Sequence, residues 1–149
     1  HDKIWELLAV RRLIDSEAAY LAAKNVAKDQ KKRFTRLVER LSTIGSGHVL
    51  MSKEGGKLYS DFFDILADST KNTIFVHLRG TIAHVLDGAF PYSRKKLSRV
   101  ENCSSTIVDQ LTRIIDAIDR RDADAAKAIT IEHIDYLEKS LRKALKEDE

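Results

Sequence analysis

The positions of most interest for function lie on helical faces that are otherwise lined by apolar residues. Four of these positions are spaced three or four residues from apolar neighbours, which turns each toward the core: Tyr59, Phe63, Leu111 and His133. A histidine on an apolar face is more often a hydrogen-bonded core residue than a ligand. Periodicity alone therefore indicates only that these four positions face the interior.

Arg11 lies four residues after Leu7 and seven before Ala18, inside the apolar stripe of the first predicted helix. Burying an unpaired charge is costly, so its guanidinium needs a partner. In a structural interpretation that partner is Asp15, one turn further on; in a functional one, the guanidinium points into a cavity and binds an anionic ligand. Both interpretations are open. Arg79 lies in a similar way beside the inward residues of a later helix.

Other residue types that could do chemistry are poorly placed for it. His77 and His84 are seven residues apart, and we expect them on the outer face or edge of their helix instead of in a metal site. The sequence has no nucleophile–base pair, no phosphate-binding loop and no second acid at helical spacing. We therefore predict that the protein is not an enzyme.

The composition favours an all-α protein. The chain has 149 residues, of which 43% are hydrophobic and 33% charged, with only six glycines and one proline. This length fits one globular domain with a substantial core. We predict an antiparallel bundle of about six helices that spans residues 1–149 as a single domain.

Capping residues and helix breakers predict where these helices begin and end. Pro91 is expected to break a helix within Ala89–Tyr92, because proline cannot continue it. The first predicted helix runs from about Lys3 to Ala27, and the second is capped by Asp29, ends at Gly45 and is followed by a loop from Ser46 to Gly56. The third helix ends at a break over Ser69–Lys71, and the fourth is capped by Asn72 and ends near Gly88. A short basic turn or loop from Ser93 to Asn102 precedes a helix from Ser104 to Arg120 and Arg121, and Asp122 caps the last helix.

Charge and cysteine content restrict the setting of the protein. The net charge is +3, but basic and acidic residues are interleaved and the basic clusters are short, which is typical of solvated surface. A single cysteine, Cys103, cannot form an internal disulfide, and this favours a reducing cytoplasm. No apolar run approaches the roughly 20 residues of a membrane span. We expect neither a membrane association nor a signal peptide.

Three segments resemble the FadR C-terminal domain family, the effector-binding domains of GntR-type bacterial transcription regulators. They are RRLIDSEAAYLAA at residues 11–23, FFDILADSTKN at 62–72, and IIDAIDRRDADAA at 114–126 with His133-Ile134 after it. The corresponding family patterns read approximately R-x-x-L-E-x-x-A-A-x-L-A-A, D-x-x-F-H-x-x-L-x-x-x-S-x-N and H-x-x-I-L-x-A-I-x-x-x-D-x-x-x-A with a closing H-L or H-I. The three segments occur in the family's order and cover nearly the whole chain.

The resemblance implies a metal site of one aspartate and three histidines inside the bundle. With Asn72 fixing the register, the aspartate falls on Tyr59, the first histidine on Phe63, the second on Leu111 and the third on His133. Only the last is retained. Phenylalanine and leucine have no lone pair to donate, and tyrosine is a poor ligand for a borderline divalent cation. We therefore predict a bundle that has lost the metal and needs no cofactor.

The resemblance further implies an effector-sensing and dimerising domain that reaches DNA only through a winged-helix domain outside this chain. Its partners would be a small-molecule effector and a second copy of itself in a homodimer. The apolar centre favours a small organic acid or a fatty acyl effector, with Arg11, Tyr59, Arg79 and His133 available for a polar head group.

Two alternatives remain at this stage. One is a metal-dependent sensor in which His133 is joined by His77, His84 or Asp61. The other is a ligand-free dimerisation module whose core is filled by Phe63 and Leu111.

Overall fold

In the computed structural model, residues 2–44 and 52–146 are described, and they form six α-helices with no strand among them. The helices are α1 (Asp2–Asn25), α2 (Lys28–Thr43), α3 (Lys53–Ser69), α4 (Thr73–Leu97), α5 (Cys103–Asp119) and α6 (Ala123–Lys146). The all-α bundle predicted from composition is confirmed. None of the helices in the described ranges is both long enough and apolar enough to span a membrane.

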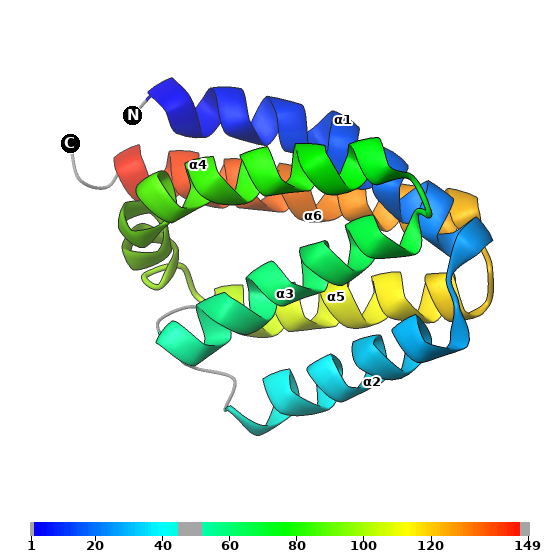
Figure 1. The fold of residues 1–149 in the computed structure, drawn as a ribbon. Coiled ribbons are helices and arrows are strands. Elements are labelled where there is room, and N and C mark those ends of the chain that lie inside the picture. Colours follow the sequence, from blue (N-terminus) through cyan, green and yellow to red (C-terminus); the bar gives the residue numbers. More distant parts are fainter. Residues whose placement is uncertain (1, 45–51, 147–149) are drawn as a thin grey trace.

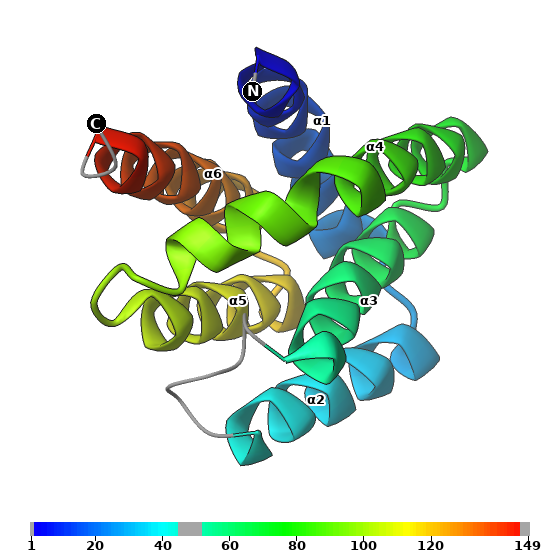
Figure 2. The same ribbon diagram turned by 90° about the vertical axis from the view of Figure 1, so that its left-hand side faces the viewer.

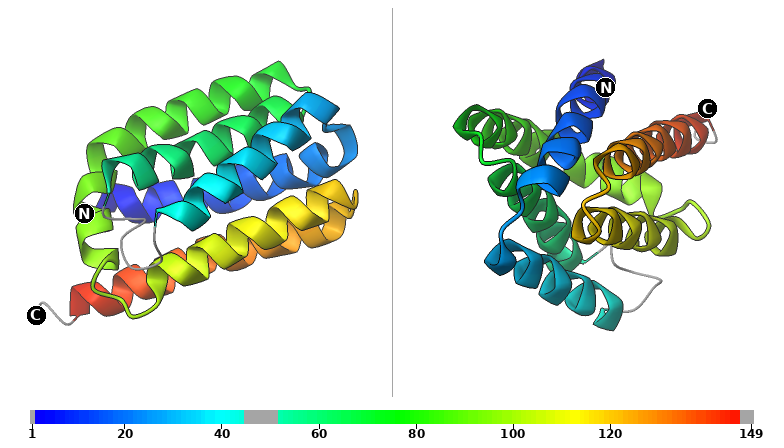
Figure 3. Two further views of the ribbon diagram at one scale, coloured as in Figure 1. Left: turned by 90° about the horizontal axis from the view of Figure 1, so that it is seen from below. Right: turned by 90° about the vertical axis from the view of Figure 1, so that its right-hand side faces the viewer.

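The helices pack as an antiparallel bundle with α1 near its centre. Helix α1 contacts α3, α4, α5 and α6, while α2 covers α3 and α5 on the far side (Figures 1 and 2). Helices α2 and α3, α3 and α4, and α5 and α6 pack against each other as successive pairs, and Figure 3 shows the bundle from below and from the end. Alanines allow α1 to approach its neighbours closely, and Ala19, Ala22 and Ala23 are fully buried.

The predicted break between α3 and α4 is confirmed. Helix α3 ends at Ser69, and Lys71 adopts a left-handed conformation with φ of 58°. The side chain of Asn72 then accepts a hydrogen bond of 2.9 Å from the backbone N–H of Ile74, as expected of a residue that caps a helix N-terminus. Asp122 caps α6 in the same manner, accepting from the N–H of Ala125 at 3.1 Å.

The prediction that Pro91 ends its helix is wrong, because α4 continues to Leu97. Proline removes one backbone donor and crowds the preceding turn, which bends a helix without necessarily ending it. The C-terminal part of α4 accordingly runs in a different direction from its N-terminal part (Figures 1 and 2). The basic segment predicted as a short turn or loop therefore belongs largely to α4, and only Ser98–Asn102 connects it to α5.

Two other boundaries differ from the prediction. Helix α2 begins at Lys28, with Asp29 in its first turn instead of at its cap; the N–H of Ala27 is satisfied by the Gln30 side chain at 3.0 Å. Helix α3 begins at Lys53, inside the predicted loop, because the Ser52 hydroxyl accepts from the N–H of Gly55 at 2.7 Å. Gly45 and the rest of that loop up to residue 51 lie outside the described residues.

The apolar face of α4 is less buried than its periodicity predicts. Ile82 and Leu86 are buried, but Phe75 and Val85 are only partly buried and Leu78 is 38% exposed. Helix α4 contacts α1, α3 and α6 along one side only, and within the described residues no helix covers its outer side. The apolar residues of α4 therefore exceed what the bundle can bury.

At one end of the bundle the helix connections are tied to one another by side chains. Arg121, at the α5–α6 connection, donates to the carbonyls of Ala23, Lys24 and Val26 at 3.1–3.4 Å, so a cation meets the negative end of the α1 dipole. Asn25 donates to the carbonyl of Thr70 at 3.0 Å. The three connections α1–α2, α3–α4 and α5–α6 thus form one linked end, on the right in Figure 1.

We expect Arg121→Ala to lower the free energy of unfolding by about 2 kcal/mol, because three carbonyls at a helix C-terminus lose a charged donor. Urea denaturation measures this change. The matched control is Arg120→Ala, which removes exposed ion pairs with Asp116 and Asp122 and should cost under about 1 kcal/mol. Equal losses in the two variants would contradict the role assigned to Arg121.

Candidate functional site

A chain of buried hydrogen bonds crosses the centre of the bundle and joins four helices. The His133 ring, on α6, lies with Nε2 at 2.6 Å from the Tyr59 hydroxyl of α3 and Nδ1 at 2.7 Å from Gln110 Oε1 of α5. Arg11, on α1, donates to the Tyr59 hydroxyl at 3.0 Å and to Asp15 at 2.8 Å. These five side chains are all buried.

The donor and acceptor roles in this chain follow from Arg11. A guanidinium can only donate, so the Tyr59 oxygen accepts from Arg11 and its single proton goes to Nε2 of His133. The imidazole then carries its own proton on Nδ1, which donates to the Gln110 carbonyl oxygen. Every contact is thereby satisfied with a neutral imidazole and a neutral phenol.

The charges agree with this assignment. Burial and the neighbouring Arg11 cation lower the pKa of His133 to about 3, so the ring is neutral at physiological pH. Burial opposes the charge on Arg11, but Tyr59 and Asp15 outweigh it and the pKa of Arg11 is raised. Burial also raises the pKa of Tyr59, which keeps the phenol protonated. The Arg11–Asp15 ion pair is thus the charged part of an otherwise neutral network.

Phe63 lies at the middle of this cluster. Its ring stacks on His133 with centroids 6.0 Å apart and an interplanar angle of 21°. The guanidinium carbon of Arg11 is 4.7 Å from the Phe63 centroid, and that of Arg79 is 5.7 Å from it. Aromatic faces attract cations, so Phe63 stabilises two arginines that approach each other inside the protein.

Arg79 is bound less completely than Arg11. It is 4% exposed, and it donates through Nε to Asp64 at 3.0 Å and through Nη2 to the carbonyl and hydroxyl of Ser60 at 3.0 and 2.9 Å. Its Nη1 is buried and has no hydrogen-bond partner within residues 2–44 and 52–146. An unsatisfied buried donor costs about 1–3 kcal/mol, so this atom marks a position where an acceptor would be strongly favoured.

The residues expected from the sequence are therefore largely brought together. Arg11, Tyr59, Phe63 and His133 contact one another directly, and Arg79 joins them across the Phe63 ring. The Arg11–Asp15 pair of the structural interpretation is present, and Arg11 donates to Tyr59 as well. Leu111 is buried as expected, but the residue of α5 that contacts His133 is its neighbour Gln110. His77 and His84 are exposed, as predicted.

Sequence reasoning missed Gln110, Ser60 and Asp64. A signal for Gln110 existed, because it lies three residues after Ile107 and four before Ile114, so a polar residue interrupts the buried face of α5. Ser60 and Asp64 gave no such signal. They meet Arg79 only because α3 and α4 fold back on each other at the Lys71 break.

The donor set at the centre does not fit a divalent metal. The four family positions carry Tyr59, Phe63, Leu111 and His133, and the lone pair of His133 Nε2 is already used by Tyr59. The buried Arg11 cation, 3.0 Å from the Tyr59 oxygen, would repel a second positive charge. Within the described ranges, no three histidine, cysteine, aspartate or glutamate side chains are grouped so that they could bind a metal ion.

The sequence profile of the FCD domain, the FadR C-terminal domain of GntR-type regulators, matches residues 6–136, and the chain belongs to this family. No curated protein matches the chain. The family membership predicted from the three segments is confirmed.

We expect His133 to make stability depend on pH. Its pKa is about 3 in the folded protein and about 6.5 when unfolded. Between these values the unfolded chain binds more protons, so the free energy of unfolding falls as the pH decreases, by up to about 1.4 kcal/mol per pH unit.

Urea denaturation at pH 7.0, 6.0 and 5.0 tests this effect. His133→Gln should lose most of the slope between pH 6.5 and 5.0, whereas His77→Gln, at an exposed position, should keep it. Identical slopes in the two variants would exclude a buried neutral imidazole at residue 133.

Proposed function

We infer from its membership of the FCD family that the chain is an effector-binding regulatory domain of a GntR-type transcription regulator, a class of domain that is not typically catalytic. We propose that its effector is a small organic acid, or the acyl group of a larger molecule, bound at the centre of the bundle without a metal. We further propose that residues 1–149 act as one cytoplasmic sensing and dimerising domain. As in other GntR regulators, the domain would work with a DNA-binding domain, which we propose is a winged helix.

The observation that carries this proposal is the buried Nη1 of Arg79. It lacks a hydrogen-bond partner within the described part of the chain, and a carboxylate oxygen of the effector would supply one. Asp64, which pairs with Arg79, is half exposed, so it neutralises the guanidinium incompletely. An anion at Arg79 would therefore gain a charge-assisted hydrogen bond and relieve an unsatisfied group.

Arg11 has a different part in the proposed site. Its charge is balanced by Asp15 and its Nη2 is bound to Tyr59, so it holds the network together and raises the local positive potential. Phe63, between the two guanidinium groups, and the buried Leu111 would contact the apolar body of the effector. This neighbourhood favours a ligand with one carboxylate and a compact apolar part.

The same electrostatics support a metal-free mechanism. In the family pattern, a metal ion supplies the positive charge that attracts an acidic effector. In this protein the Arg11 and Arg79 guanidinium groups both contact the Phe63 ring and supply positive charge themselves. An arginine also offers fixed hydrogen-bond donors, which suit a planar carboxylate.

Binding at this centre requires the bundle to open. Arg11, Tyr59, Phe63 and His133 are each 0–4% exposed, so a ligand cannot reach them without displacing other side chains. Because Arg121 and Asn25 link the helix connections at one end, opening is easier at the opposite end. A ligand that prefers the opened bundle would shift the population toward it and change the spacing of two attached DNA-binding domains.

An exposed apolar strip on α1 and α4 supports the proposed homodimer. Four large apolar side chains on these two adjoining helices face solvent, with exposures of 38–70%: Val10, Leu13, Ile74 and Leu78. Contiguous exposed apolar surface of this kind commonly marks a protein–protein interface. This strip adjoins the helices that carry Arg11 and Arg79, so dimer geometry and the proposed ligand site share two helices.

The closed core supports a second candidate function, a ligand-free dimerisation module. The hydrogen bonds from Asp15 through Arg11, Tyr59 and His133 to Gln110 are complete, and Phe63 fills the space beside them. In this case the network would only stabilise the bundle, and no small acid would raise its melting temperature.

A thermal-shift screen of short-chain, dicarboxylic and aromatic organic acids tests the first proposal. A ligand at 100 times its Kd should add about 2.7 kcal/mol of stability. Arg79→Gln should remove this gain, and Arg113→Gln, which breaks an exposed ion pair with Glu132, should retain it. A chelator should leave the gain unchanged. Absence of any stabilising acid, with both variants folded, would favour the ligand-free module.

The dimer is tested by substituting the apolar strip. We expect Leu13→Glu combined with Leu78→Glu to convert a dimer into a monomer, because two charges would be desolvated in the interface. Light scattering after size-exclusion chromatography measures the mass. Thr112→Glu, an exposed position on α5, is the control and should remain dimeric. A dimer that survives both charges would place the interface on another face.

A further inference from the structure

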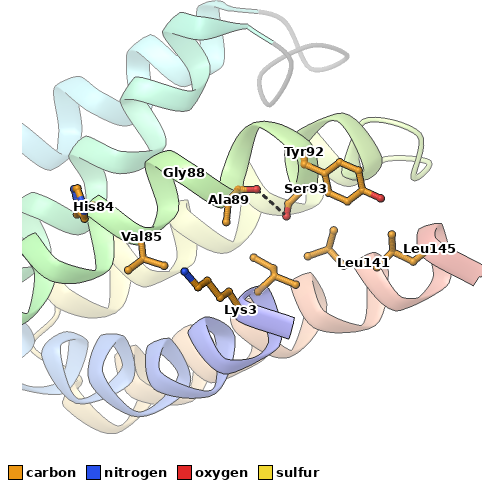
Figure 4. A pocket seen from close by; sticks show the side chains of 10 residues that line it. Lys3, His84, Val85, Gly88, Ala89, Tyr92, Ser93, Leu141 and Leu145 are labelled. Carbon is orange, nitrogen blue, oxygen red and sulfur yellow. Dashed lines mark hydrogen bonds between the residues drawn. The ribbon is translucent and has the colours of Figure 1, made fainter. Parts of the chain in front are cut away.

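A cavity of about 580 Å³ lies at the bundle end where α1 begins and α6 ends, away from the Arg11–His133 network. It is enclosed by the first turn of α1, the second half of α4 and the last turns of α6 (Figure 4). Its volume falls within the range of roughly 300–1,000 Å³ that small-molecule sites occupy. Helix α6 rises about 12 Å between His133 and Leu141, so this cavity and the proposed effector site are separate.

The walls of this terminal cavity are apolar and come from three helices. Val85 of α4 and Leu141 and Leu145 of α6 direct aliphatic side chains into it (Figure 4), and Ile4 of α1 also lines it. Ile4 and Leu141 are buried, so the floor is part of the hydrophobic core. Such walls would bind an apolar group by removing it from water.

The polar residues of the cavity carry positive charge and no negative charge. Among the residues that the structure describes, the lining includes Lys3 and His84 but no aspartate or glutamate. The Lys3 side chain extends from α1 toward Val85 of α4, across the edge of the cavity (Figure 4). Lys3 also lines the neighbouring groove that contains Glu6, and no ion pair of Lys3 is formed within the described residues. An anionic group at this edge would meet an ammonium and an imidazole N–H donor.

Gly88 lies on the α4 side of the cavity, at an exposed position of the helix. A Cβ atom at this position would meet nothing within 4 Å, so the space beside it is empty. Glycine in a helix interior costs about 1 kcal/mol relative to alanine. A larger side chain would be tolerated by the backbone at this helical position and would occupy the space.

We propose that this terminal cavity is a second ligand site, which binds a hydrophobic monocarboxylate with its apolar part against Ile4, Val85 and Leu141 and its carboxylate at Lys3. The ligand would bridge α1, α4 and α6 at the end opposite the linked connections. It would thereby hold together three helices that otherwise leave a void between them.

Isothermal titration with decanoate below its critical micelle concentration tests the proposal. We expect saturable binding to the wild-type protein, with 1-decanol binding at least about threefold more weakly because it lacks the charge. The only tryptophan, Trp5, follows Ile4 and lies under the Arg142 guanidinium at 4.2 Å, so its fluorescence should change on binding. No saturable binding, or equal affinity for decanol, would overturn the proposal.

Two glycines of α4 provide a matched pair of variants. Gly88→Leu should place a side chain at the cavity and weaken decanoate binding by more than about tenfold. Gly80→Leu is the control and should bind as the wild type does. Gly80 also has open space around it, but it does not line the cavity. Lys3→Met should raise the Kd about three- to tenfold. Both glycine variants should remain folded, because leucine favours helix.

Arg79→Gln separates this site from the effector site. It should leave decanoate affinity unchanged; a large loss would place decanoate in the core instead. If a second copy of the chain covers the cavity, Gly88→Leu would reduce the dimer mass and decanoate would not bind the wild-type protein, which also overturns the proposal.

Discussion

A single buried cation determines how the centre of this protein is organised. Arg11 is 1% exposed, and its charge can be accommodated only by groups that reach it from α1 and α3. Asp15 supplies the opposite charge and Tyr59 supplies an oxygen; once Tyr59 accepts from Arg11, its proton must go to His133. The hydrogen bond from Arg11 to Tyr59 thus fixes the tautomer of His133. Its Nδ1–H then needs an acceptor, which Gln110 of α5 supplies.

Arg11 is not the only cation at this centre. Both Arg11 and Arg79 contact the Phe63 ring, so positive charge lies on it from two side chains, while Tyr59, Phe63 and Leu111 offer poor donors for a metal ion. The two arginines are not equivalent, because Arg11 is neutralised by a buried carboxylate and Arg79 by a half-exposed one. Of the two, only Arg79 has a buried donor, Nη1, that lacks a hydrogen-bond partner among the described residues.

The sequence predicted the elements whose cause is local, and it failed where the cause is tertiary. Asn72 and Asp122 were identified as caps because a capping side chain acts within three residues of itself. Pro91 was misread because the bend that it causes is tolerated by what packs around α4. In the site, the facing directions of Tyr59 and His133 followed from helical periodicity, but their contact depends on how α3 and α6 lie across the bundle. Residues exposed along α4, such as Leu78, could not be foreseen, because periodicity gives the apolar side of a helix and not whether anything covers it.

The linked helix connections have a consequence for how the protein folds. Contacts within the α3–α4 and α5–α6 pairs join residues that are close in sequence, and such local contacts form quickly. The hydrogen bonds of Arg121 join residues 95–98 positions apart, so they form only once the end of α1 has met the α5–α6 connection. We expect these bonds to slow unfolding more than they speed folding, so this end of the bundle would contribute mainly to kinetic persistence.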